Sequence, residues 1–278
     1  MRGNPGNQLP PGPFHAARRR SIAAERAYNA AIMIDLHCHL LPGIDDGPET
    51  LDEAIALAAH AVASGITRSV VTPHVHVGRF ENDLPSIRRD LAKFQAELER
   101  LNIPLELGLG GEIRLGAEII DLVTESRVPF LGERDGYKIM LLEFPHGHIP
   151  VGSDKFVAWM LKNRIRPMIA HPERNRQIMD DVNKLTPFVT MGCMLQVTAG
   201  SVEGRFGEQA RERALDLLAR GWVSVLASDA HNLEHRPPEL EPGRKAAAQI
   251  IGEAESWKLV RDTPLSILGN GPRAAQST

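Results

Sequence analysis

The fold of this 278-residue chain is decided by the stretch IDLHCHLLPGIDDGP, which runs from Ile34 to Pro48. Its first half is an apolar run that we interpret as a β-strand. Side chains alternate between the two faces of a strand, so His37 and His39 point the same way while Cys38 points the other way. Two imidazoles on one face can bind one metal ion. Two polar residues that merely end a strand have the same spacing, so the motif alone leaves both interpretations open.

Apolar runs like this one recur along the chain and alternate with amphipathic stretches. The alternation, without a long linker, favours one α/β barrel of seven strands over two domains. Helical spacing predicts helices over 50–64, 87–101, 153–163, 208–220 and 244–260, the first with a capping box between Thr50 and Glu53. The seven strands are expected over residues 33–39, 68–74, 105–112, 138–144, 167–171, 193–198 and 223–229.

Six of the seven expected strands end in potential metal ligands. After the first pair come His74 in TPH, Glu112 in GGE, Glu143 in LLEF, His171 in AHPERN, and Asp229 and His231 in SDAHN. The carboxyl ends of parallel barrel strands form the face on which active sites are built. Glu143 lies in an apolar run, where an unpartnered carboxylate is costly, so it needs a cation or a proton. The combined pattern predicts a site for several metal ions.

Other polar side chains can contribute to the same site. Asp45 and Asp46 lie in a turn flanked by Gly and Pro, where either one can start a helix or bind a metal ion. Asp35 shares the inward direction of His37 and His39 and can support them. On the sixth expected strand, Gln196 and Thr198 share one face and can point into the site.

Composition limits the class of protein and its compartment. Two cysteines cannot form a disulfide framework or a cysteine-rich zinc site, so we expect a reducing cytoplasm and metal binding by His and carboxylates. Residues 1–32 carry five Arg and one Glu, a net +4, which leaves −7 on the rest because the total is −3. That balance disfavours nucleic-acid binding.

The N-terminal segment reads as an extension of the folded part. It lacks the apolar core of a signal peptide, so we expect residues 1–32 to be a disordered or helical basic extension. A solvated tail is favoured over an Arg-rich anchor for acidic lipid or nucleic acid. No stretch of the chain is apolar enough to predict a transmembrane segment.

The quoted motifs, in their order along the chain, resemble the PHP (polymerase and histidinol phosphatase) superfamily. Within it, IDLHCHLLPGIDDGP, TPH, GGE, LLEF, AHPERN and SDAHNLEHRPP are similar to the bacterial PHP-type protein-tyrosine phosphatases of the CpsB/YwqE group. This group occurs in capsule and exopolysaccharide gene clusters. The resemblance spans about residues 34–268. It implies a single distorted (β/α)7 barrel of the PHP type over residues 33–270.

The resemblance also implies up to three divalent metal ions, with manganese expected and iron or zinc as alternatives. One ion would be held by His37, His39, Glu112 and Asp229. A second would be held by Glu112, Glu143 and His171. A third would be held by Asp46, His74 and His231, with Asp46 preferred to Asp45 because it directly precedes Gly-Pro. Arg174 and Arg236 match the phosphate-binding arginines of the family.

These parts imply hydrolysis of protein phosphotyrosine. A metal-bridged hydroxide would attack phosphorus while Arg174 and Arg236 hold the phosphate. The implied substrate is a bacterial tyrosine kinase that controls capsule or exopolysaccharide synthesis. A phenolate leaving group, with a conjugate acid of pKa about 10, needs little help from a general acid. Loop residues His76, His146 and His148 are candidates for such help, without a firm signal.

Several alternatives remain at this stage. A related PHP phosphoesterase could act on a small metabolite such as histidinol phosphate. An amidohydrolase also begins with His-x-His, but it usually has a bridging Lys where this chain has Glu143. A metal-bound scaffold would lack ligands, and none is missing. A cysteine phosphatase needs Arg six positions after its Cys, whereas Ile44 and Ala199 stand there, so both cysteines are expected to be packing residues.

Overall fold

Strand β1 (Met33–Cys38) is buried along its whole length and is the first strand in the part of the chain that the structure describes. The structure is a computed structural model that describes residues 32–269. The basic extension expected over residues 1–32 lies outside the described residues, apart from Ile32. Buried strands with few polar side chains are typical of parallel sheets covered on both faces.

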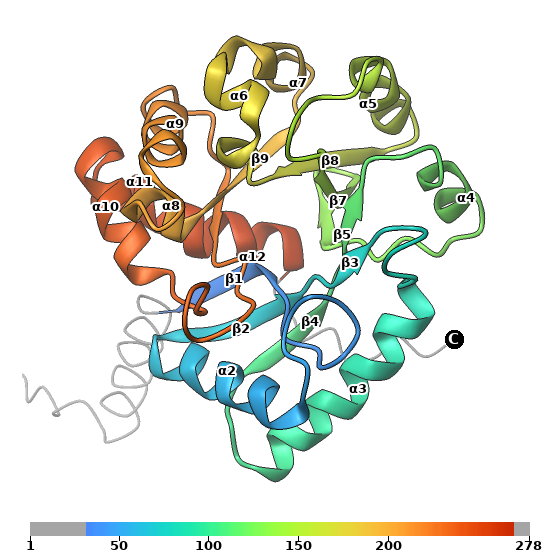
Figure 1. The fold of residues 1–278 in the computed structure, drawn as a ribbon, viewed down its shortest axis with the longest axis vertical. Helices are drawn as coiled ribbons and strands as arrows, with labels where there is room; N and C mark the ends of the chain where they lie inside the picture. Colours follow the sequence, from blue (N-terminus) through green and yellow to red (C-terminus); the bar gives the residue numbers. More distant parts are fainter. Residues whose placement is uncertain (1–31, 270–278) are drawn as a thin grey trace, which may run out of the picture. The chain divides into compact units, whose positions relative to one another are not determined.

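The strands form two sheets, and Figure 1 shows them at the centre with helices around them. The first sheet has the order β1-β2-β4, all parallel, with β2 at Ile66–Val71 and β4 at Glu106–Leu109. The second has the order β10-β9-β8-β7-β5-β3, also parallel, and β6 (Gly132–Arg134) pairs antiparallel with β7. Its strands are β3 (His74–Val75), β5 (Glu112–Arg114), β7 (Tyr137–Glu143), β8 (Ile165–Ala170), β9 (Met194–Thr198) and β10 (Val225–Ala227).

Backbone hydrogen bonds join the two sheets next to β1. The Asp229 amide donates to the His37 carbonyl at 2.7 Å, and the His39 amide donates to the Ala230 carbonyl at 2.8 Å. Cys38 and Ala230 form an isolated parallel bridge between the same segments. The first strand and the last one described therefore meet at residues that the sequence marks as metal ligands.

Two expected strands are each broken in two, which corrects the prediction of continuous strands over 68–74 and 105–112. Pro73 cannot donate to a ladder, and β2 ends before it while β3 starts after it. Between β4 and β5, a Cβ on Gly111 would lie 2.5 Å from Cγ of Pro129, so only glycine fits. As a result, His74 and Glu112 begin new strands, where they are register partners, instead of ending old ones.

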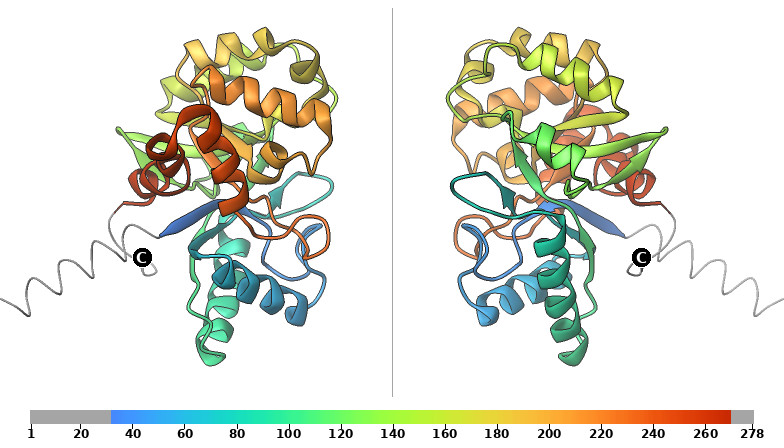
Figure 2. Two further views of the ribbon diagram at one scale, coloured as in Figure 1. Left: turned by 90° about the vertical axis from the view of Figure 1, so that its left-hand side faces the viewer. Right: turned by 90° about the vertical axis from the view of Figure 1, so that its right-hand side faces the viewer.

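The helices pack around these strands, as the side views in Figure 2 also show. The capping box predicted between Thr50 and Glu53 is present at the start of α2. The single helix expected over 244–260 is wrong, because Gly252, at φ 84°, ends α10 and a new helix follows. The helices are α2 (Leu51–Ala63), α3 (Leu84–Arg100), α4 (Ile119–Thr124), α5 (Ser153–Lys162), α6 (Arg176–Asp180), α7 (Thr186–Thr190), α8 (Ala199–Glu203), α9 (Glu208–Ala219), α10 (Glu241–Ile251), α11 (Glu253–Trp257), α12 (Thr263–Leu268), the 3₁₀ segments η1 (Pro172–Arg174) and η2 (Val182–Leu185), and the π-helical η3 (Lys258–Asp262).

The expected α/β class is confirmed. When β2 with β3 and β4 with β5 are counted as single bent strands, seven parallel strands alternate with helices over residues 32–269. Their hydrogen bonding is divided between two sheets. None of the helices in this range is both long enough and apolar enough to cross a bilayer.

Replacing Gly111 with Ala should destabilise the fold by about 1–3 kcal/mol, because the added methyl group would press on the stiff Pro129 ring. Urea unfolding of the variant and the wild type would measure the loss. Gly147→Ala is the matched control, since a Cβ there meets nothing within 4 Å. Equal stability of Gly111→Ala and wild type would contradict the close approach at this bend.

Candidate metal centre

The Glu112 carboxylate lies at the centre of the predicted ligand set. It is 1% exposed, at the start of β5. Its Oε1 lies 2.7 Å from Nε2 of His171, and its Oε2 lies 3.0 Å from Nδ1 of His74. The Nε2 atoms of His37 and His39 are each 3.4 Å from the same Oε2. Four imidazoles from three segments of the chain therefore converge on one buried carboxylate.

His37 and His39 turn the same ring nitrogen toward each other. Their Nε2 atoms are 3.2 Å apart. Nδ1 of His37 faces the Gln196 amide oxygen at 2.9 Å, and Nδ1 of His39 faces the Asp45 carboxylate at 2.6 Å. Both partners are acceptors, so each Nδ1 carries a proton, and when both rings are neutral their Nε2 lone pairs face each other. A cation between the two nitrogens removes this conflict, as a metal ion would.

Two buried carboxylate oxygens of the cluster accept no hydrogen bond. They are Oε2 of Glu112 and Oδ1 of Asp229, and Nε2 of His231 is likewise without a hydrogen-bond partner. Oδ1 of Asp229 lies 3.2 Å from Nε2 of His37. Buried polar atoms are normally satisfied. Unsatisfied oxygens beside imidazole nitrogens are the donor set that divalent transition metals bind, so the residues fit the metals that the sequence predicts.

A second part of the cluster lies toward solvent. Oδ1 of Asp46 is 3.2 Å from Nε2 of His74 and 3.4 Å from Nε2 of His231. Nδ1 of His231 donates to the Asp229 carbonyl at 3.0 Å, which turns Nε2 toward Asp46. Asp45 instead bonds His39 and the His74 amide. Asp46 thus occupies the position that the sequence analysis assigned to it, and Asp45 orients the neighbouring ring.

The nine predicted ligands are brought together, but their grouping differs in part from the expected one. His171 groups with His37 and Asp229, and its Nε2 also lies 2.7 Å from Oε1 of Glu112, with which it was expected to share an ion. The sets whose ligand atoms lie within 4.8 Å of one another are His39, Asp46, His74 and His231; His37, His39 and Glu112; His37, His171 and Asp229; and His74, Glu112 and Glu143.

Sequence reasoning missed Arg114. Its guanidinium lies 2.8 Å from Oε1 of Glu143 and supplies the cation that this buried carboxylate requires. A signal was present, because Arg114 stands two residues after Glu112 and so shares its face of β5. Burial, and then the Glu112 carboxylate, raise the pKa of Glu143 even so.

The backbone is strained at two of the ligands. His171 has φ 31° and Asp229 has φ 53°, the left-handed region that residues with side chains seldom adopt. Strain of this kind persists where the surroundings fix it, and it is common at functional sites. Behind Asp229, the buried Asp35 accepts hydrogen bonds from the Ser228 amide, at 3.0 Å, and from the Ser228 hydroxyl. Asp35 therefore supports the β10 end of the cluster.

Electrostatics within the cluster keep the Glu112 and Asp229 carboxylates ionised. Burial opposes the charge on Glu112, but His37, His74 and His171 outweigh it and hold the Glu112 pKa well below its usual range. Burial also opposes the charge on Asp229, whose pKa is held low chiefly by Arg174.

The pKa values of the histidines shift in opposite directions, depending on the groups beside each ring. Burial and Arg174 lower the pKa of His171 to about 3, and burial and the adjacent His39 lower that of His231 to about 4. For His39, Asp45 outweighs the cost of burial and raises the pKa to about 9. A proton on His39 thus fills the role of a cation when none is bound.

The two predicted phosphate-binding arginines lie against this cluster. Arg174 and Arg236 both donate to Oδ2 of Asp229. Their Nε atoms are buried and have no hydrogen-bond partner. Two guanidiniums with unused donors beside this ligand cluster can bind an anion.

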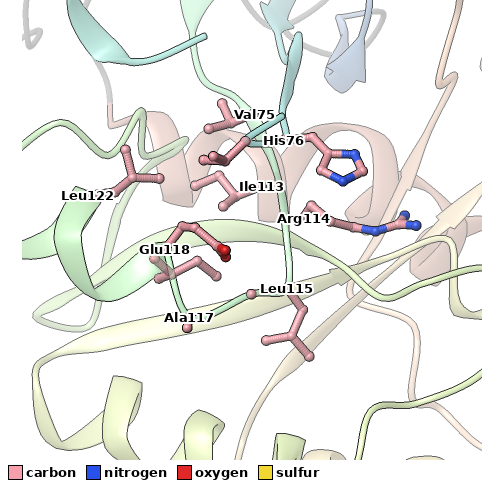
Figure 3. A pocket seen from close by; sticks show the side chains of 11 residues that line it. Val75, His76, Ile113, Arg114, Leu115, Ala117, Glu118 and Leu122 are labelled. Carbon is pink, nitrogen blue, oxygen red and sulfur yellow. The ribbon is translucent and has the colours of Figure 1, made fainter. Parts of the chain in front are cut away.

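A cavity of about 330 Å³ adjoins the centre beyond β3 and β5 (Figure 3). Its lining includes Val75, His76 and Ile113, which follow the ligands His74 and Glu112 in the chain. Arg114 also lines it and links it to the centre, because its guanidinium reaches Glu143. In the figure, His76 and Arg114 lie at one end of the cavity and Leu122 at the other.

Neither cysteine belongs to the centre. Cys38 and Cys193 are buried and free. Burial raises the pKa of the Cys38 thiol well above its usual value and that of Cys193 to about 12. Thiols that stay protonated are poor nucleophiles, as expected for packing residues.

Comparison with known proteins decides the family. Residues 33–269 match the family described as "Capsular polysaccharide synthesis, CpsB/CapC". The chain belongs to the CpsB/CapC family. It is 36% identical over 205 residues to the tyrosine-protein phosphatase YwqE of Bacillus subtilis (strain 168), covering 73% of this chain and 79% of YwqE. It is 28% identical over 245 residues to the tyrosine-protein phosphatase CpsB of Streptococcus pneumoniae, covering 85% of this chain and 98% of CpsB.

Solved structures agree with membership of the CpsB/CapC family. One match comes from crystal structures of YwqE from Bacillus subtilis and CpsB from Streptococcus pneumoniae, described as unique metal-dependent tyrosine phosphatases. It has a TM-score of 0.79 and 30% identity, and covers 86% of this chain and 98% of the other. A mutant organophosphorus hydrolase from Deinococcus radiodurans shares the fold alone. It has 14% identity and a TM-score of 0.53, and the match covers 87% of this chain and 94% of the hydrolase.

Divalent metal should stabilise the protein, because it relieves the conflict between His37 and His39. At free Mn²⁺ about 100 times the Kd, the free energy of unfolding should rise by about 2.7 kcal/mol per site. Calorimetry with and without chelator would measure the shift in Tm. His39→Ala should reduce the shift, whereas His235→Ala, whose side chain is exposed and belongs to none of the ligand groups among residues 32–269, should keep it. Identical Tm values with metal and with chelator would contradict the metal centre.

Asp45→Ala should weaken metal binding about 10- to 100-fold, the usual effect of removing a carboxylate that orients a ligating imidazole. The reason is the 2.6 Å contact with His39. Metal titration followed by elemental analysis would measure it. Asp52→Ala, on the exposed first turn of α2, is the control. Unchanged affinity in Asp45→Ala would show that His39 needs no such support.

Proposed function

We propose that this chain is a metal-dependent phosphatase that hydrolyses phosphotyrosine in proteins. The observation that carries the proposal is the junction at Asp229, where one carboxylate oxygen faces the His37 nitrogen and the other accepts from Arg174 and Arg236. A metal cluster and an anion site meet at this single side chain. Phosphate monoesters are the substrates that use both at once.

The metal ligands we propose are the nine side chains of the cluster that includes Glu112, with up to three ions and manganese as the first candidate. When bound, such ions polarise phosphoryl oxygens, neutralise their charge and lower the pKa of water. Gln196 holds the His37 ring, and Asp45 holds the His39 ring, in the tautomer that a metal requires. The ligands are His37, His39, Asp46, His74, Glu112, Glu143, His171, Asp229 and His231.

The arginines would bind the phosphoryl group. Each already donates one nitrogen to Asp229 and keeps its Nε free in a buried position. Planar guanidiniums bind phosphate oxygens with two parallel hydrogen bonds, so Arg174 and Arg236 can hold the group against the cluster and stabilise its charge in the transition state. Both residues touch the reacting group in this proposal.

A tyrosine ester suits this site because phenolate leaves with little assistance. Of the three loop histidines considered, His146 lies against the cluster, with its ring centroid 6.1 Å from that of His171. His76 instead lines the neighbouring cavity. Burial, followed by Arg174, lowers the pKa of His146. The ring is therefore neutral near pH 7 and is better suited to take up a proton than to give one to the leaving group.

The biological setting we propose follows the family. Its description refers to capsular polysaccharide synthesis, and relatives named tyrosine-protein phosphatases support a phosphotyrosine protein as the substrate. We place the enzyme in the cytoplasm, acting on a tyrosine kinase that controls capsule or exopolysaccharide synthesis. Two free, buried cysteines accord with a reducing compartment.

One preparation tests the proposal. Protein of measured metal content should release phosphate from a phosphotyrosine peptide faster than from histidinol phosphate. Asp229→Ala should lower turnover at least about 100-fold, as when a group that organises transition-state charge is lost, while the circular dichroism spectrum stays unchanged. Cys38→Ala with Cys193→Ala should keep activity.

Metal-loaded wild type that leaves the peptide intact would refute the proposal, and faster turnover of histidinol phosphate would favour a small-metabolite phosphatase.

A further inference from the structure

Phe206 lies against both arginines that we assign to the phosphoryl group. Its ring centroid is 4.7 Å from Cζ of Arg174 and 6.0 Å from Cζ of Arg236. An aromatic face attracts a guanidinium within about 6 Å. One half-buried ring therefore contacts both guanidiniums.

The Phe206 ring thus supports the Arg174 and Arg236 guanidiniums together.

The chain holds this ring in place from several elements. Gly204, at φ 93°, ends α8, and Gly207, at φ 90°, precedes α9, so a tight turn presents Phe206 between them. Arg205 in the same turn donates to Glu239. Glu239 in turn lies 3.0 Å from Nε2 of His60 on α2. The turn is therefore tied both to the segment before α10 and to α2.

The two guanidiniums need such a support because they carry like charges and share one acceptor. Both donate to Oδ2 of Asp229, which offsets part of their repulsion. The face of Phe206 offers a second attraction that uses none of their N–H donors. The unpartnered Nε atoms of Arg174 and Arg236 therefore stay available for an anion.

We propose that Phe206 is a positioning residue for phosphate binding, which holds Arg174 and Arg236 as a pair with their free donors directed at the phosphoryl group. The inference rests on the proposed function for the assignment of these arginines. Phe206 acts through the arginines and takes no part in bond making or breaking.

Variants that remove or keep the aromatic face test this role in the full-length, metal-loaded protein. Phe206→Leu and Phe206→Met keep an apolar side chain without a π face, and Phe206→Tyr and Phe206→Trp keep the face. Phe156→Leu on α5, where the ring stacks on Trp159 away from the arginines, is the matched control. Titration calorimetry with inorganic phosphate measures anion binding without any need for turnover.

We expect Leu and Met at position 206 to weaken phosphate binding about five- to tenfold, in line with the strength of a partly desolvated cation–π contact. KM for the phosphotyrosine peptide should rise more than kcat falls. Tyr and Trp should stay within about twofold of wild type, as should Phe156→Leu. Metal content and Tm should be equal across the variants whose phosphate binding is compared.

The outcomes separate this inference from the proposed function. Wild-type phosphate affinity in Phe206→Leu and Phe206→Met would overturn the positioning role, and so would equal losses in the aromatic and aliphatic variants. If Phe206→Leu fails to fold, the comparison of Met with Tyr decides in the same way. A wild type that binds phosphate with the expected variant pattern but leaves phosphotyrosine peptides intact would refute only the proposed function.

Discussion

The burial of the Glu112 carboxylate among four imidazoles is the interaction on which the rest of the structure depends. A charge taken out of water in this way is costly unless close partners compensate it. Those partners come from β1, the start of β3 and the end of β8. The bends at Pro73 and Gly111, and the division of the strands into two sheets, bring these segments to one point.

The sequence predicted the ligands better than it predicted their surroundings. His37 and His39 could be placed on one face from strand parity alone, and most of the other candidate ligands could be located from the ends of apolar runs, because both signals are local. The breaks before His74 and Glu112 could not be predicted, since they depend on contacts such as that between Gly111 and Pro129.

Charged groups outside the ligand set show the same difference between local and distant signals. Arg114 could have been found from its spacing to Glu112, because position i+2 on a strand shares a face. The contact of Phe206 with Arg174 and Arg236 could not, because it joins three loops that are distant in sequence. The apolar run around Glu143 indicated from the sequence that its carboxylate needs a cation. In the structure, the cation that contacts this carboxylate is the Arg114 side chain.

The hydrogen bonds between the first and last parallel strands set an order of events during synthesis. The carbonyl of His37 and the amide of His39 pair with Asp229 and Ala230, about 190 residues later in the chain. A ribosome must therefore release almost the whole folded part before these ligands can meet. A nascent chain holds isolated histidines for most of its translation, and the complete centre forms only when its two ends close on each other.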